Sequence, residues 1–129
     1  MPRPIHFEIH AGDPQRAIGF YSQLFGWTFT KWESPMDYWL IKTGEKGTVG
    51  IDGGLLPRQG EAPTAMQAVK AFVCTVDVPD LAATLKRVAE LGGKVVVPTM
   101  PIPTVGWLAY AIDTETNVFG MMQMDASAK

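Results

Sequence analysis

The stretch IHFEIHAGDPQRAIGFYSQLFGW, residues 5–27, decides the fold. Apolar and polar side chains alternate over residues 5–10, which is the period-two pattern of a half-buried strand. Asp13 is a good helix N-cap, and Pro14 suits the first helical position, where a missing N–H costs nothing. An apolar stripe of period 3.6 follows, and Gly26 suits the left-handed position that ends a helix. The stretch therefore predicts a strand, a capped helix and a glycine stop.

The alternation gives the first strand two different faces. Its apolar side chains are expected to pack beneath the helix, so its polar side chains point away from the helix. The polar set consists of His6, Glu8 and His10. His10 lies near the predicted strand end and is expected to be a solvated turn residue. The other two are the first candidates for a functional site.

The pattern recurs in the second half of the chain. Asp77-Val78-Pro79-Asp80 supplies capping groups, a helical stripe runs from Leu81 to Leu91, and Gly92-Gly93 ends it. With Asp77 aligned to Asp13, the sequence repeats at roughly 64 residues, which is typical of duplicated structural units. Further strands are predicted at residues 27–32, 38–43, 48–56, 69–76, 94–97, 107–112 and 118–124, with a tight hairpin connection at 44–47 and a stiff, proline-rich loop at 98–106.

These elements predict an α+β fold of two tandem β-α-β-β-β modules within a single domain, residues 1–129. Module one spans residues 4–57, the linker 58–68, and module two 69–124. A helix covers one face of each small sheet, so the uncovered faces must meet or curl around something. We therefore expect a concave, cup-shaped mixed sheet with the helices on its outer face.

Charge and composition narrow the class of partner. The net charge is −2 with 11 scattered Lys and Arg residues, which gives no electrostatic case for nucleic acid or an anionic membrane. No signal peptide and no run of about 18 apolar residues is evident. Cys74 is the single cysteine, and alternation predicts that it lies buried and inert beneath the second helix. We expect a soluble, cytoplasmic protein with a small-molecule ligand or substrate.

Three segments carry a family resemblance that spans about residues 4–124. HFEIHAGDPQRAIGFYSQLFGW, VDVPDLAATLKRVAELGGKVVVPTMPIP and GWLAYAIDTETNVFGMMQ resemble the vicinal oxygen chelate superfamily. Its members include glyoxalases, bleomycin resistance proteins and extradiol dioxygenases, and the likeness is greatest to glyoxalase-like members of unassigned role. The resemblance implies modules paired within or between chains into eight-stranded cups, and hence a homodimer.

The resemblance also bears on metal binding. Metal-dependent members contribute a His or Glu from the first and last strand of each module. Carried onto this sequence, those positions fall on His6, on Gly53 or a neighbour, on Ala71 and on Gly120. His6 alone can ligate, whereas a catalytic metal needs about three protein ligands. The resemblance therefore implies a dismantled metal site and no cofactor, with a divalent metal ion as the alternative.

His6 and Glu8 stand about 6.6 Å apart along one strand face. A direct hydrogen bond between them would hold the imidazole in one tautomer and create a general base with its orienting group. The alternatives are polar residues that line a wet cup or a dimer seam and are satisfied by water and backbone, or an unconventional metal site. Asp52 and Glu115 are expected to be solvated. The full set of ligand-binding candidates is His6, Glu8, Thr30, Trp32, Trp39, Thr75, Tyr110 and Met122.

Three functional hypotheses follow. The first is a small-molecule-binding protein of the bleomycin-resistance type, because aromatic and Met side chains suit a flat apolar or aromatic ligand. The second is a glyoxalase-like lyase or isomerase that uses His6 and Glu8 for proton transfer, with or without a divalent metal. The third is a structural dimer with a collapsed cup, in which the aromatic residues are ordinary packing.

Overall fold

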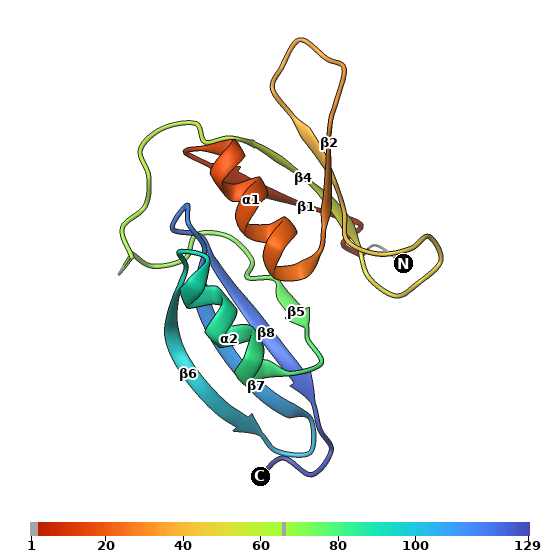
Figure 1. The fold of residues 1–129 in the computed structure, drawn as a ribbon, viewed down its shortest axis with the longest axis vertical. Coiled ribbons are helices and arrows are strands. Elements are labelled where there is room, and N and C mark those ends of the chain that lie inside the picture. The colour runs from red at the N-terminus through yellow and green to blue at the C-terminus, as the bar shows by residue number, and fades with distance from the viewer. Residues whose placement is uncertain (1–2, 66) are drawn as a thin grey trace. The chain divides into compact units, whose positions relative to one another are not determined.

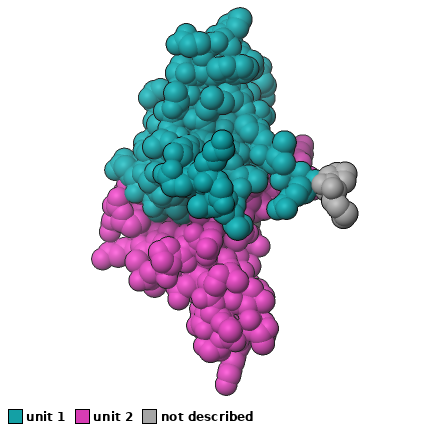
Figure 2. Space-filling view, turned by 90° about the vertical axis from the view of Figure 1, so that its right-hand side faces the viewer, with its two compact units in different colours: residues 1–62 teal, residues 63–129 magenta. Residues whose placement is uncertain are grey.

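The computed structural model describes residues 3–65 and 67–129, and it divides into two compact units, residues 1–62 and 63–129 (Figure 2). Residue 66, in the predicted linker, lies outside the described residues. Unit 1 contains β1 (His6–Ala11), α1 (Pro14–Phe25), β2 (Thr28–Lys31), β3 (Trp39–Lys42) and β4 (Asp52–Pro57). Unit 2 contains β5 (Thr75–Asp77), α2 (Leu81–Glu90), β6 (Lys94–Ile102), β7 (Gly106–Ile112) and β8 (Val118–Met124) (Figure 1).

Both units have the same topology. The strand order is β1-β4-β3-β2 in unit 1 and β5-β8-β7-β6 in unit 2. In each sheet the first strand pairs in parallel with the last, and the other pairs are antiparallel. The predicted α+β fold of two β-α-β-β-β modules is therefore confirmed.

Helix α1 begins and ends at the residues that the sequence predicts. The Asp13 carboxylate accepts a hydrogen bond from the backbone N–H of Arg16 at 3.2 Å, and Pro14 occupies the first turn. Gly26 adopts the left-handed conformation with φ of 74° and donates its N–H to the carbonyl of Ser22 at 2.9 Å. A residue with a Cβ would be strained at this position, so glycine stops the helix.

The core of unit 1 lies between α1 and one face of its sheet. Phe7, Ile9 and Ala11 of β1 belong to this core, which confirms that the apolar side of β1 is the covered one. Trp27 closes the end of this core by stacking on Tyr21, with ring centroids 5.3 Å apart. The fully buried members are Ala11, Ala17, Ile41 and Leu55, and the residues packed against them are Phe7, Ile9, Ile18, Trp27, Phe29 and Trp39.

Helix α2 starts later than the alignment of Asp77 with Asp13 suggests. Asp77 is the last residue of β5, and the N-cap is Asp80, whose Oδ1 accepts from the N–H of Ala83 at 3.0 Å. Asp80 is therefore the structural counterpart of Asp13, and the repeat is longer than expected. Asp77 and Asp80 both lie in the predicted capping segment. The structure distinguishes them, because Asp77 ends β5 and Asp80 has the extended backbone of the residue just before the helix.

We expect Asp80→Ala to lower the free energy of unfolding by about 1 kcal/mol, because a first-turn N–H of α2 loses its acceptor. Asp77→Ala is the matched control, because Asp77 is exposed at the end of β5 and is not the N-cap of α2. Urea denaturation of both variants measures the difference. Equal losses from the two substitutions would contradict the assignment of the cap.

Strand β6 is longer than predicted and includes most of the segment that the sequence assigned to a loop. It runs through Pro98 and Pro101 to Ile102, so the prediction of a proline-rich loop is wrong for residues 98–102. Prolines are tolerated here because β6 is the outer strand of its sheet, and an outer strand has N–H groups that need no partner. The register also shifts between Val95 and Val97 and between Val97 and Met100, which relaxes the ladder around Pro98.

Strands β4 and β5 begin several residues later than predicted. The connection between β3 and β4 occupies residues 43–51 rather than a tight turn, and β4 begins at Asp52. Strand β5 begins at Thr75, so Cys74 precedes it and is exposed instead of buried beneath α2. The alternation over residues 69–76 was misleading because Val69, Phe72 and Val73 are exposed and stand outside any strand.

Within the described ranges, neither helix has the length and apolar character needed to cross a membrane.

Candidate functional site

The polar face of β1 continues across the sheet of unit 1. Glu8 pairs with Gly54 of β4, and Gly54 pairs in turn with Leu40 of β3. Paired residues share a face, so His6, Glu8 and Leu40 lie on the face away from α1. We call this surface the second face of unit 1. Tyr38 precedes Leu40 by two residues and reaches back over the same face.

Tyr38 connects the two residues singled out from the sequence. Its hydroxyl lies 2.8 Å from Nε2 of His6 and donates to Oε2 of Glu8 at 2.9 Å. The predicted direct hydrogen bond between His6 and Glu8 is thus replaced by a chain that runs through a phenol. On the other side, Oε1 of Glu8 lies 3.7 Å from Nε2 of His10, which belongs to β1 and is not the turn residue expected.

Gly54 makes this arrangement possible. A Cβ at this position would overlap the hydroxyl and the ring carbons of Tyr38. The ring therefore lies directly on the backbone of β4, and only 8% of Tyr38 is exposed. A glycine in a strand often marks such a close approach, and the Gly53-Gly54 pair is the sequence signal for it. Tyr38 itself carried no signal, because the register of β1, β4 and β3 that brings it over His6 and Glu8 cannot be read from the sequence.

The surroundings of Tyr38 hold its hydroxyl in the protonated form. The largest cause of the raised pKa of Tyr38 is burial, followed by the hydrogen bond to Glu8 and the negative charge of that carboxylate. Together they raise the pKa of Tyr38 from 10.0 to about 12. The neutral phenol is therefore present throughout the physiological range and always has a proton to donate.

This shift predicts how stability depends on pH. The folded pKa exceeds the unfolded one, so the contribution of Tyr38 is complete below about pH 10 and is lost as the pH rises through about 12. We expect a loss of about 2 kcal/mol over that interval. Denaturation of the wild type and of Tyr38→Phe at several alkaline pH values measures this loss of stability. In an absorbance titration of tyrosinate formation, the ionisation step near pH 12 should be present in the wild type and absent from Tyr38→Phe. A stability difference that does not change with pH would contradict the shift.

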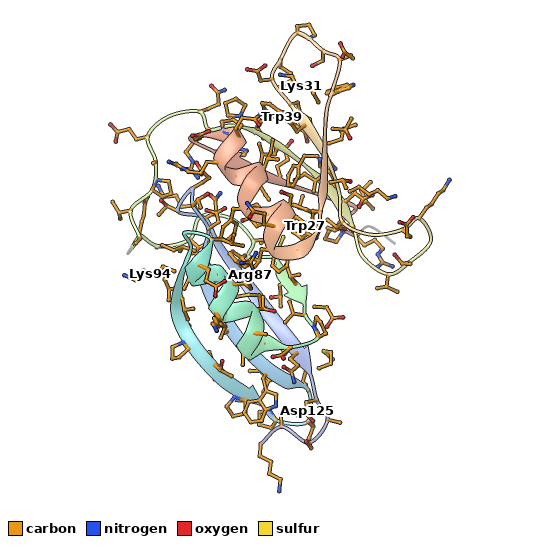
Figure 3. The ribbon with its side chains drawn as sticks, viewed as in Figure 1. Trp27, Lys31, Trp39, Arg87, Lys94 and Asp125 are labelled. Atoms are coloured by element: carbon orange, nitrogen blue, oxygen red, sulfur yellow. The ribbon has the colours of Figure 1, made fainter. Side chains whose placement is uncertain are left out.

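Trp32 borders the same face. Its ring contacts Tyr38 edge to face with centroids 5.8 Å apart, and 48% of the residue is exposed. Thr30 pairs with Leu40 and so lies on this face as well. Trp39 does not: it packs against the core on the α1 side, with the Lys31 ammonium 4.4 Å from its ring centroid (Figure 3). Four of the five candidates in unit 1 thus share a surface.

The three candidates in unit 2 lie together on the corresponding face of the other sheet. Gly120 pairs with Thr75 on one side and with Tyr110 on the other, and Met122 follows two residues later on β8. A Cβ at Gly120 would approach Oγ1 of Thr75 to 2.8 Å and the Tyr110 ring to 3.1 Å. An aromatic ring over a strand glycine therefore occurs in both units. The opposite face of this sheet carries the buried Ala109, Ala111 and Met121.

The family positions for a metal do not supply a donor set here. Gly53, Ala71 and Gly120 have no side-chain ligand atom, and Nε2 of His6 already contacts Tyr38. Among residues 3–65 and 67–129, no three His, Cys, Asp or Glu side chains come together in a way that could hold an ion. The residues present do not fit the family's metal site.

Glu115 departs from the solvated role expected of it, because only 2% of the residue is exposed. Its Oε2 accepts from the hydroxyl of Thr114 at 2.7 Å. The neighbouring Asp113 accepts from the backbone N–H groups of Glu115 and Asn117 at 2.7 and 2.9 Å. These bonds order the turn between β7 and β8. A short local hydrogen-bond network therefore explains how an acidic turn residue can be buried.

Two tandem modules, each with a helix on one face and polar and aromatic groups on the other, define a protein of the two-module glyoxalase type. Sequence comparison matches residues 3–120 to the Glyoxalase/Bleomycin resistance protein/Dioxygenase superfamily. A glyoxylase-like domain-containing protein from Didymella fabae is 31% identical over 112 residues, covering 85% of this chain and 84% of the relative. The chain belongs to this superfamily.

Solved structures of low sequence identity share the fold. A glyoxalase-related enzyme from Fulvimarina pelagi has a TM-score of 0.69 and 17% identity over 100% of this chain and 98% of its own. TnmS3, an antibiotic-binding protein from Streptomyces sp. CB03234, has a TM-score of 0.68 and 19% identity over 97% of this chain and 98% of its own. The fosfomycin resistance protein FosX from Listeria monocytogenes has a TM-score of 0.71 and 12% identity over 96% of this chain and 91% of its own.

Proposed function

We propose that this protein binds a small aromatic ligand on the second face of unit 1, without a metal ion. The observation that carries the proposal is the hydrogen-bonded chain of His6, Tyr38 and Glu8 beside the half-exposed ring of Trp32. Small-molecule sites combine aromatic surface with a few placed polar groups. An exposed indole next to three connected polar atoms has this composition.

The relatives support a binding role. Similar folds occur in an antibiotic-binding protein and in a fosfomycin resistance protein, so this scaffold accommodates small molecules in other chains. Three of the four family metal positions lack a donor in this sequence. Binding without a metal ion therefore explains the residues present better than metal-dependent chemistry does.

Tryptophan fluorescence tests the binding role. We expect bleomycin, or another member of a panel of fused-ring aromatic antibiotics, to quench the emission by stacking near Trp32. Trp32→Phe should remove most of this response. Trp107→Phe is the matched control and should keep it, because Trp107 donates to Asp125 at 3.0 Å and lies on the same face of its sheet as the buried Ala109 and Ala111. Quenching that survives in Trp32→Phe would place the ligand elsewhere, and the absence of any response would reject the proposal for this class.

His6→Ala should weaken binding of the same ligand by roughly five- to tenfold, the effect of losing about one hydrogen bond. Isothermal titration calorimetry measures the change. The fold should survive, because His6 is exposed on its strand. An unchanged affinity would remove His6 from the site.

A second candidate is proton transfer in a lyase or isomerase reaction. It is favoured by the Tyr38 hydroxyl, which links the His6 imidazole to the Glu8 carboxylate and can orient the base. Under this reading, His6→Ala abolishes turnover of a carbonyl substrate and does not merely weaken binding. Tight stoichiometric uptake of nickel, zinc or manganese would instead support the metal-dependent alternative.

We further propose that the protein acts as a cytoplasmic homodimer whose modules pair into a cup, and that it has no nucleic-acid or membrane partner. The family resemblance and the scattered charges support these assignments. Analytical ultracentrifugation measures the oligomeric state directly. A monomer at micromolar concentration would contradict the dimer.

A further inference from the structure

The hydroxyl of Tyr38 has one proton and two neighbours. A phenol O–H donates one hydrogen bond and accepts others, whereas a carboxylate only accepts. The proton of Tyr38 is directed to Oε2 of Glu8 at 2.9 Å. No hydroxyl proton is then left for Nε2 of His6, which lies only 2.8 Å from the same oxygen. That nitrogen must therefore carry the proton of this contact.

The opposite arrangement is disfavoured by the surroundings of Glu8. If Tyr38 donated to His6, two oxygen atoms 2.9 Å apart would face each other unless Glu8 were protonated. The Glu8 side chain is 45% exposed and lies 3.7 Å from Nε2 of His10. The arrangement with the Tyr38 hydroxyl as donor and Oε2 of Glu8 as acceptor avoids this repulsion between the two oxygen atoms. The raised pKa of Tyr38 agrees with a proton held between the phenol and this carboxylate.

We infer that Tyr38 is a positioning residue that fixes neutral His6 in the tautomer with the proton on Nε2, so that Nδ1 presents a lone pair to the ligand. Within the described ranges, His6 makes no hydrogen bond besides the one to Tyr38, and its side chain is exposed. Nδ1 is therefore open to an incoming group. This inference rests on the proposed binding function of the same face.

The tautomer selects a chemical class of ligand. A lone pair on Nδ1 accepts hydrogen bonds and cannot donate them. The site therefore favours an aromatic ligand with a phenol, enol or amide proton in the plane of its ring. Ethers and other acceptor-only analogues of the same shape are disfavoured, because they leave Nδ1 without a partner. Trp32 supplies the aromatic contact for both kinds of molecule and does not discriminate between them.

Nitrogen-15 NMR of the histidine-labelled protein tests the tautomer without any ligand. Long-range proton–nitrogen spectra at neutral pH should show His6 with a protonated Nε2 and an unprotonated Nδ1. Tyr38→Phe should shift His6 toward a mixture of the two tautomers, whereas Tyr21→Phe should leave it unchanged because Tyr21 lies in α1, on the other face of the same sheet. A protonated Nδ1 in neutral wild-type His6 would overturn the inference while leaving the binding function open.

Phenol and anisole then test the ligand class, because anisole has a methyl group in place of the donor proton of phenol. Phenol should shift the Nδ1 resonance at least several-fold more than anisole at equal concentration. Equal shifts would overturn donor selection but keep the binding face. If neither fragment shifts His6, the ligand class is wrong. The proposed binding function is rejected as well only if the antibiotic panel also leaves the tryptophan fluorescence unchanged.

Discussion

Gly54→Ala is expected to destroy the candidate site while leaving most of the fold intact. The new methyl group would overlap the hydroxyl and ring of Tyr38. The obstructing atoms lie at the far end of a side chain, so Tyr38 can swing away and β4 need not move. The ring then loses its burial and the hydroxyl loses both His6 and Glu8. Overpacking of this kind costs about 1–3 kcal/mol, and ligand affinity should fall at least as far as in His6→Ala.

Urea denaturation and calorimetric titration measure the two effects of Gly54→Ala. Gly19→Ala in α1 is the matched control, because its Cβ would meet nothing closer than Nε2 of Gln23 at 3.8 Å. We expect it to stabilise the protein by up to about 1 kcal/mol. In a Tyr38→Ala background, Gly54→Ala should cost almost nothing, since the obstructing ring is absent. An equal cost in both backgrounds would show that the strain does not come from Tyr38.

Leu55→Ala is expected to have the largest effect on stability. Leu55 follows Gly54 on β4 but points to the other face, where it is fully buried in the core beneath α1. Truncation removes its buried methyl groups and leaves a cavity, which costs about 2–5 kcal/mol. For a protein of this size we expect the melting temperature to fall by about 10 °C or more.

Leu40→Ala is the matched control for Leu55→Ala. Leu40 belongs to the adjacent strand but is 46% exposed on the second face, so its truncation should change stability by less than about 1 kcal/mol. Differential scanning calorimetry compares the two variants. Similar losses would mean that the two faces of this sheet are equally buried, which contradicts the assignment of an open second face.

The sequence predicts most of the elements because their signals are local. Asp13, Pro14 and Gly26 act through atoms within one helical turn, so their roles can be read from neighbouring residues. The two faces of β1 follow from alternation alone. The β-α-β-β-β order of each unit follows from the repeat, and its identical strand topology confirms the duplication.

The remaining features depend on which strands become neighbours. Tyr38 joins His6 and Glu8 because β4 lies between β1 and β3 and has a glycine at the crossing point, and no local pattern contains that register. Pro98 and Pro101 predict a loop unless β6 is known to be an outer strand. Cys74 was expected to be buried because alternation continues past the point where β5 begins.

The prolines of β6 have a consequence for how unit 2 meets other molecules. A free strand edge is a template to which a foreign peptide can add through backbone hydrogen bonds, and this is a common start of aggregation. Pro98 and Pro101 remove two donors from β6, and the register shifts beside Pro98 interrupt the regular spacing that an added strand would need. The β6 edge of this sheet is therefore unsuited to pairing with an added strand. The sheet can be extended by a further strand only at its other edge, β5.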